Sequence, residues 1–312
     1  MNYESRIMNN YFKIIFGIFA FFILYSLFLI PEAKAATLYL EPAEGEYYQD
    51  DTFIVEVRID SEGEQINTVK VNLNFPQDKL KIVDAGKGGS ILTLWAEEPV
   101  YSNENGTLSF IGGIPQGFRG EGKLLSVPFR VRQTDAKIEF LDTSVVLLND
   151  GLGTPAKLTF PGAIFTILPE IAEVPRDEWQ EELEKDKTPP EPFEIFIGQD
   201  PAIFDGKYFI AFFTTDVGTG VDYYEVLEAD ERGYQRGTTL KAEWKRAESP
   251  YLLEDQSLQS IIKVRAVDKA GNERVAEIIP PYKITWKEIL LGIIIVAMIG
   301  VVIWQLIRRF RK

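Results

Sequence analysis

The sequence predicts an all-β protein made of two β-sandwiches in tandem, the first with about nine strands and the second with about seven. Two observations predict this fold class. Short runs of alternating apolar and polar residues follow one another through the body of the chain, separated by Gly, Pro and Asn turns. No stretch with the period of a helix interrupts these runs, so antiparallel strands are expected to pack into sandwiches.

Composition narrows the functions that these sandwiches can have. The 312 residues include 33 Lys and Arg against 47 Asp and Glu, a net charge of -14, and the acidic surplus lies between the two ends. Such a surface repels phosphate, which argues against a nucleic-acid partner. The absence of Cys and His removes disulfides, thiolate catalysis, Cys-based zinc sites and the commonest general base. We therefore expect no enzyme and no cofactor.

Residues 1–35 are predicted to be a signal peptide. Two bases, Arg6 and Lys13, precede an unbroken apolar run over 14–30, and Pro31 follows it. The stretch 33–35 has the A-x-A pattern of a cleavage site. An uncleaved signal anchor is the alternative, because the apolar run is long for a signal peptide.

Residues 287–307 are predicted to be a transmembrane helix. The apolar run has the length that spans a bilayer, with Trp286 and Trp304 near its ends. The basic tail 308–312 is predicted to lie in the cytoplasm. The two ends together predict a single-pass protein of the cell membrane whose body lies outside the cell.

The first domain is predicted over 36–168, and its stretch 71–75 shows how its strands are recognised. Val71, Leu73 and Phe75 point to one face, and Asn72 and Asn74 point to the other. A proline directly after Phe75 ends the alternation and predicts a turn.

A hairpin is predicted at Asn105-Gly106, which lies between two alternating runs. This dipeptide favours a type I′ turn.

An acidic, proline-rich linker is predicted over 169–192, with a short helix over 177–187. The second domain follows over 193–284. In its stretch "IIKVRAVD", Ile262, Val264 and Ala266 are predicted to face inward. Together with the turn "DKAGNE" that follows, this pattern resembles the immunoglobulin-like and fibronectin-III-like modules of bacterial surface proteins.

The first domain resembles a cohesin domain. The stretches that carry the resemblance are "DDTFIVEVRID", "INTVKVNLNFPQDKLKIVDAG", "GTLSFIGG", "GKLLSVPFRVR" and "PGAIFTI". The resemblance implies a nine-stranded jelly roll, related to carbohydrate-binding modules, that binds dockerin modules through an Asn and an Asp early in one strand. Thr68 and Lys70 stand in these two places, so a base replaces an acid.

The predicted binding strip is Thr68, Lys70, Asn72 and Asn74, on the polar face of that strand. The alternative is that these four are ordinary solvent-facing residues of a half-buried sheet. The expected function is a surface-anchored, non-catalytic module that binds a dockerin-like protein or a polysaccharide.

Two other functions stay open. Direct carbohydrate binding, in polysaccharide catabolism, would use Trp95, Tyr101 and Phe118 to stack on sugars, although such rings more often belong to a core. A structural or adhesive stalk would need no ligand.

No metal site is predicted. Acidic groups occur at Asp50 and Asp51 and at Asp60, Glu62 and Glu64, but neither has the spacing of an EF-hand. Both groups are interpreted as solvated acidic edges.

Overall fold

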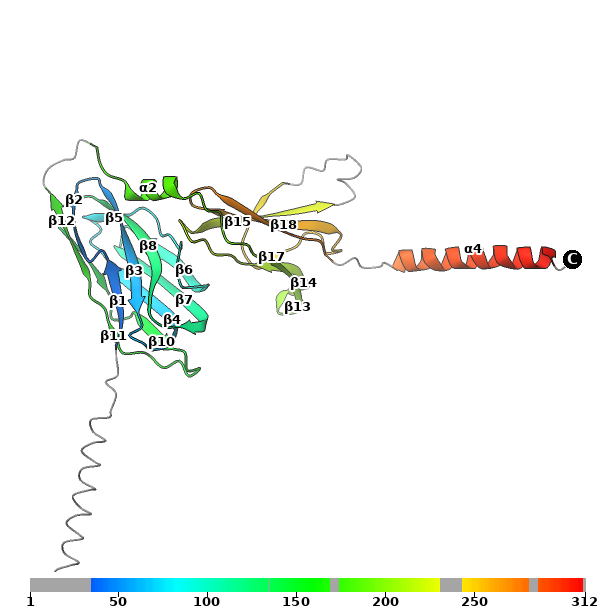
Figure 1. Cartoon of the computed structure of the whole chain (residues 1–312), viewed down its shortest axis with the longest axis horizontal. Helices are drawn as coiled ribbons and strands as arrows, with labels where there is room; N and C mark the ends of the chain where they lie inside the picture. The colour runs from blue at the N-terminus through cyan, green and yellow to red at the C-terminus, as the bar shows by residue number, and fades with distance from the viewer. Residues whose placement is uncertain (1–34, 134, 169–173, 231–242, 281–285, 311–312) are drawn as a thin grey trace, which may run out of the picture. The chain divides into compact units, whose positions relative to one another are not determined.

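The protein is described by a computed structural model that covers residues 35–133, 135–168, 174–230, 243–280 and 286–310. The predicted signal peptide lies outside these ranges except for its last residue. The chain divides into two compact units after Asp177, inside the predicted linker, and the short stretch Gly86–Gly89 is grouped with the second. We call the units the first and the second domain (Figure 1).

The described residues of the first domain form twelve strands, β1–β12, in two sheets, which Figure 1 shows facing each other. The sheet with the order β11-β1-β3-β8-β5 contains β1 (Ala36–Glu41), β3 (Thr52–Asp60), β5 (Leu80–Ile82), β8 (Glu121–Val131) and β11 (Leu158–Thr159). The other has the order β2-β12-β9-β4-β7-β6, with β10 also paired to β4. It contains β2 (Glu44–Tyr48), β4 (Ile66–Asn74), β6 (Leu94–Ser102), β7 (Thr107–Phe118), β9 (Ala136–Phe140), β10 (Val145–Leu148) and β12 (Ala163–Leu168).

The two sheets share one hydrophobic core, which makes the first domain a sandwich. Phe53 of β3 and Phe165 of β12 come from different sheets, and their ring centroids lie 4.8 Å apart. Phe75, directly after β4, meets Phe129 of β8 edge-on at 5.4 Å. All four rings are buried. The predicted sandwich is therefore confirmed as an all-β architecture.

Two details of the first domain differ from the predicted pattern. The described residues form twelve strands where the sequence predicts about nine, because β5 and β11 are too short to show an alternating period and β2, EGEYY, does not alternate. The pairing is also not wholly antiparallel: β1 pairs with β11, and β12 with β2, in parallel. Strands this short carry no signal for their direction.

The alternation predicted in β4 is present. Val69, Val71 and Leu73 are buried, and the residues between them are at least partly exposed. Pro76 ends the strand, and its carbonyl accepts hydrogen bonds from the N–H groups of Lys79 and Leu80. The chain then enters β5, which belongs to the opposite sheet.

The predicted hairpin joins β6 and β7, but its turn is not of type I′. The loop spans four residues, 103–106, and Gly106, with φ +65°, is the only one of them with a positive φ. A type I′ turn needs positive φ at two central residues.

The second domain has seven described strands in two sheets. They are β13 (Ile195–Asp200), β14 (Ile203–Phe212), β15 (Val221–Asp230), β16 (Lys245–Ala247), β17 (Tyr251–Leu252), β18 (Ser260–Asp268) and β19 (Glu273–Ile278). The orders are β13-β14-β17 and β16-β15-β18-β19. As predicted, Ile262, Val264 and Ala266 are buried. Phe212 and Tyr224, from different sheets, have ring centroids 5.1 Å apart, so this domain too is a sandwich.

The predicted linker is ordered over much of its described length. Arg176 accepts a hydrogen bond from the Thr52 N–H through its carbonyl, and its own N–H donates to Asp51. These contacts hold this part of the chain to the first domain. The short predicted helix is present as α2 (Glu178–Lys185), in which Trp179 is buried.

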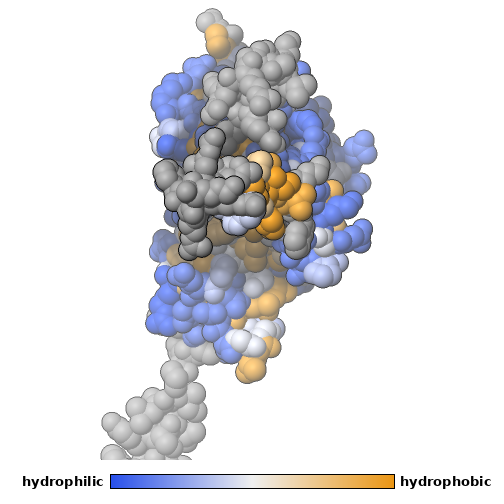
Figure 2. All heavy atoms as spheres, turned by 90° about the vertical axis from the view of Figure 1, so that its right-hand side faces the viewer, coloured by the Kyte–Doolittle hydropathy of each residue, from blue (hydrophilic) through white to orange (hydrophobic). Residues whose placement is uncertain are grey.

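The prediction of a membrane-spanning helix is not supported. The C-terminal helix α4 covers Trp286–Phe310. Among the described residues, no helix combines the length and the apolarity needed to cross a membrane. Among the coloured residues of the face drawn in Figure 2, most are hydrophilic, and apolar residues gather in a few groups.

Candidate functional site on a sheet face of the first domain

The candidate site is the side of strands β10, β4, β7 and β6 that is turned away from the core, here called the outer face. Neighbouring residues of paired strands project to the same side of a sheet, so the register defines its members. They are Val145 and Leu147 of β10, Thr68, Lys70, Asn72 and Asn74 of β4, Thr107, Ser109, Ile111 and Gly113 of β7, and Leu94, Glu97, Val100 and Ser102 of β6.

Lys70 lies in the middle of this face. It is paired with Ile111 of β7 on one side and with Val145 of β10 on the other. Beyond Ile111 the row continues to Glu97 of β6. Lys70 is partly exposed, and it forms no salt bridge with any residue that the structure describes. The outer face therefore presents an ammonium group between two apolar side chains.

The same face carries exposed apolar side chains on the strands beyond this cation. Leu94 is 58% and Val100 is 66% exposed on β6, where β-bulges interrupt the pairing with β7. Ile111 lies between β4 and β6 and is partly exposed. Exposed apolar side chains that lie together on one sheet face indicate a binding surface, whereas apolar side chains scattered singly over a surface do not.

The four residues of the predicted strip lie on this face, but they differ in what they contact. The Asn72 side chain donates hydrogen bonds to the carbonyl and the hydroxyl of Thr143, at 3.1 and 2.9 Å. Thr68 donates from its hydroxyl to the side chain of Asn67, at 3.0 Å. Asn74 is exposed. Asn72 is thus tied into the fold, and Lys70 and Asn74 are the members most open to a partner.

The predicted stacking aromatics lie on the other side of the same strands. Trp95 pairs with the buried Gly112, packs against the core and lies 5.7 Å from the ring of Phe110. Phe118 also packs against the core. Tyr101 is 36% exposed at the sheet edge, where burial and the charge of Asp84 raise the pKa of its hydroxyl. The structure does not bring the three rings together into one platform.

The acidic residues considered as ion ligands serve the local fold. Asp51 is buried, and its carboxylate accepts hydrogen bonds from the N–H groups of Tyr48 and Arg176. Asp60 accepts one from the N–H of Glu62. The bonds from Tyr48 and Glu62 are local turn contacts, and the bond from Arg176 attaches the linker to the first domain.

The sequence pattern misses another acidic group, in the second domain. Asp186, Asp216 and Asp268 bring carboxylate oxygens together. Asp268 lies in the "DKAGNE" stretch, which was interpreted only as a turn, and Asp186 lies in the predicted linker. The three are far apart in the sequence, so no spacing motif connects them.

Of three comparisons with known proteins, only the one with solved structures finds similar proteins. No protein-family profile matches the sequence. No curated protein matches it either. The chain resembles cohesin domains. A non-cellulosomal cohesin from Archaeoglobus fulgidus is 18% identical, with a TM-score of 0.37, over 43% of this chain and 92% of that one. The seventh ScaB type I cohesin of Pseudobacteroides cellulosolvens is 13% identical, with a TM-score of 0.39, over 45% of this chain and 96% of that one.

A type I cohesin–dockerin complex from Clostridium thermocellum gives a third similarity, with 15% identity and a TM-score of 0.35 over 43% of this chain and 93% of that chain. The resemblance noted from the sequence is thus also found among solved structures. At these identities and TM-scores it carries no argument about what this chain binds.

Proposed function

We propose that the first domain is a non-catalytic binding module and that a protein partner docks on the outer face. One observation carries the proposal: Lys70 stands without a salt bridge to any described residue, between Ile111 and Val145 and on the same sheet face as the exposed Leu94 and Val100. A protein interface combines an apolar centre with a few charged groups that select the partner.

The chemistry of the face favours a protein over a polysaccharide. Sugar rings are bound by exposed aromatic rings, but Trp95 and Phe118 pack against the core. Exposed aliphatic side chains around a lysine suit a protein surface that offers aliphatic groups and a carboxylate opposite Lys70. Because the sequence resembles a cohesin, we propose a dockerin-type module as this partner. The base at Lys70 would then select dockerins with an acidic contact residue.

The proposal also places the module at the cell surface. This part is supported by the sequence alone, namely the apolar run at 14–30, which is predicted to belong to a signal peptide. Cell fractionation with protease treatment of intact cells tests it. Cleavage of the body by external protease is the expected result, and full protection would contradict the location.

The binding surface is tested with the purified full chain against a panel of dockerin modules by surface plasmon resonance. We expect at least one module to bind. Lys70→Glu should weaken that binding by about tenfold or more, since a like charge would then face the partner's carboxylate. Val100→Asp should have a similar effect, because it places a charge in the apolar part of the interface.

Lys81→Glu is the matched control. Lys81 is exposed on β5, in the opposite sheet, so the same change of charge should leave the affinity unchanged. Equal weakening by both lysine variants would show a general charge effect and contradict the proposed surface. A glycan array run in parallel covers the alternative: binding to glycans with no response to any dockerin would refute the proposed partner.

A further inference from the structure

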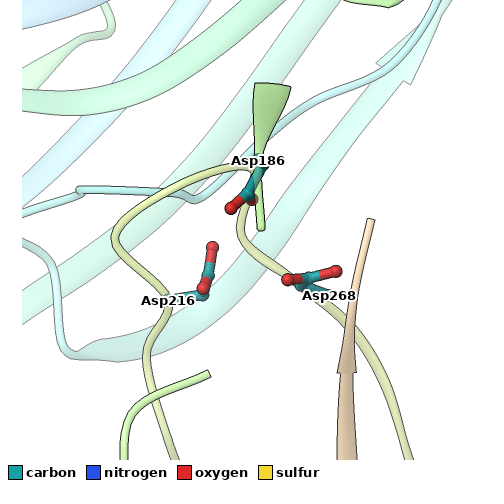
Figure 3. A group of neighbouring side chains, drawn as sticks. All are labelled: Asp186, Asp216 and Asp268. Atoms are coloured by element: carbon teal, nitrogen blue, oxygen red, sulfur yellow. The ribbon is translucent and has the colours of Figure 1, made fainter. Parts of the chain in front are cut away.

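Three aspartates of the second domain bring their carboxylates to one point. Asp186 follows α2, Asp216 lies in the loop between β14 and β15, and Asp268 is the last residue of β18. One oxygen of each lies within 4.8 Å of the others. Figure 3 shows the three side chains, from separate segments, directed toward a common space.

Two of the carboxylates are held in place by hydrogen bonds. Asp186 accepts from the N–H and the hydroxyl of Thr219, both at 2.8 Å. Asp268 accepts from the N–H and the side-chain amide of Asn272, at 2.7 and 2.8 Å. Asn272 also donates to the carbonyl of Asp186, at 3.2 Å. These donors fix the positions of the carboxylates before any ligand binds.

Asp216 is the residue that this arrangement leaves incomplete. Its side chain is only 3% exposed, and one oxygen accepts a hydrogen bond from the N–H of Gly220 at 2.8 Å. The other oxygen, Oδ1, is buried and has no hydrogen-bond partner in the described part of the chain. A buried carboxylate oxygen without a partner costs free energy, and two further carboxylates beside it add repulsion. Accordingly, burial raises the pKa of Asp216, and the charges of Asp186 and Asp268 raise it further.

We propose that Asp186, Asp216 and Asp268 together bind one calcium ion. Calcium takes carboxylate oxygens at about 2.3–2.6 Å, so oxygens on opposite sides of one ion lie up to about 5 Å apart. A mutual separation within 4.8 Å allows all three carboxylates to reach the same ion. The ligands are all hard oxygens, which disfavours the softer transition metals.

Calcium suits this group better than magnesium does. Magnesium demands near-ideal octahedral geometry at about 2.0–2.1 Å and keeps most of its water, whereas calcium accepts irregular arrangements. The three aspartates come from separate segments of the chain, and Thr219 and Asn272 set the positions of Asp186 and Asp268. We expect such a group of ligands to suit calcium, which is larger and accepts a less regular coordination geometry.

The ion would connect three segments at one end of the second domain: the residue after α2, the β14–β15 loop and the end of β18. Among the described residues, eight make up the buried apolar cluster of this domain. A ligand that binds only the folded state adds stability to such a small core. Calcium should therefore raise the unfolding temperature of the second domain.

The test uses the full chain, freed of metal with a chelator and then titrated with calcium chloride. Calorimetry should show one site with a Kd of about 0.1–1 mM, the range found for extracellular calcium-binding modules. Calcium at 10 mM should raise the midpoint temperature of one unfolding transition by several degrees, as measured by differential scanning calorimetry. Magnesium at the same concentration should give less than half of this shift, and an equal shift would overturn the assignment to calcium.

Asp216→Asn and Asp186→Asn should each abolish the shift. In chelator, Asp216→Asn should unfold at a higher temperature than the unmodified chain, because the substitution removes a charge from a repulsive group. The matched control is Asp222→Asn, an exposed aspartate of β15 in the same domain, which should keep the full calcium response. Calcium binding that is unchanged in both site variants, or a calcium response absent from the unmodified chain, would overturn the proposal.

Discussion

Single residues of the outer face divide into those that hold the fold together and those left for a partner. Asn72 and Asn74 illustrate the division, since they lie two positions apart on the same side of β4. Asn72 binds Thr143 through its side chain, and its backbone N–H and carbonyl both bond to the Ser144 hydroxyl. Asn74 is exposed, and its side chain makes no hydrogen bond to a described residue. One sequence pattern thus covers two different roles.

This division predicts different costs for the same substitution. Asn72→Ala should lower the free energy of unfolding by about 1–2 kcal/mol, because it removes two hydrogen bonds and leaves the Thr143 carbonyl without this donor. Asn74→Ala should change it by less than about 0.5 kcal/mol. Urea unfolding of both variants measures the difference. Equal costs would mean that the hydrogen bonds to Thr143 contribute nothing to stability.

At the scale of elements, the β6–β7 hairpin shows how a tertiary contact changes a local turn. The Phe75 N–H donates to the Gly106 carbonyl at 2.8 Å, so the loop rests on the end of β4. Asn103 bonds to the backbone N–H and carbonyl of Ile82 through its side chain. These contacts favour the four-residue loop over the two-residue turn that Asn105-Gly106 predicts.

Gly106 should be the most sensitive position of this hairpin. A Cβ there would lie 2.1 Å from the Phe75 carbonyl oxygen, and the φ of +65° disfavours any other residue. We expect Gly106→Ala to lower the free energy of unfolding by at least about 2 kcal/mol. Gly63 has φ +87° with nothing within 4 Å of a Cβ. Gly63→Ala should therefore lower the free energy of unfolding only through backbone strain, by about 1 kcal/mol. If both variants lower the free energy of unfolding equally, the close approach to the Phe75 carbonyl makes no contribution.

The elements also show what sequence patterns can reveal. Long alternating strands such as β4 and β18 are predicted correctly, because each buries one face and exposes the other. Two-residue β11 and three-residue β5 are set by their neighbours and carry no period. The same limit applies to sites. Lys70 could be placed on an outward face from its strand, whereas the Asp186, Asp216 and Asp268 group exists only through folding.

For the whole molecule, the stability rests on two separate hydrophobic cores. The core of the first domain draws on both of its sheets and includes Ile138 and Phe110, which are completely buried. The core of the second domain is smaller and includes Ile262. No described residue belongs to both clusters. Cores that share no residue are expected to melt as separate cooperative units.

We therefore predict two thermal transitions in the full chain and a matched pair of substitutions that assigns them. Ile138→Val in the first domain and Ile262→Val in the second each remove one buried methylene, at about 0.5–1.5 kcal/mol. Each should lower only its own transition, by several degrees, as scanning calorimetry can measure. The transition lowered by Ile262→Val should also be the one that calcium raises. If either substitution lowers both transitions equally, the two cores unfold as one unit, because independent domains would not share the cost.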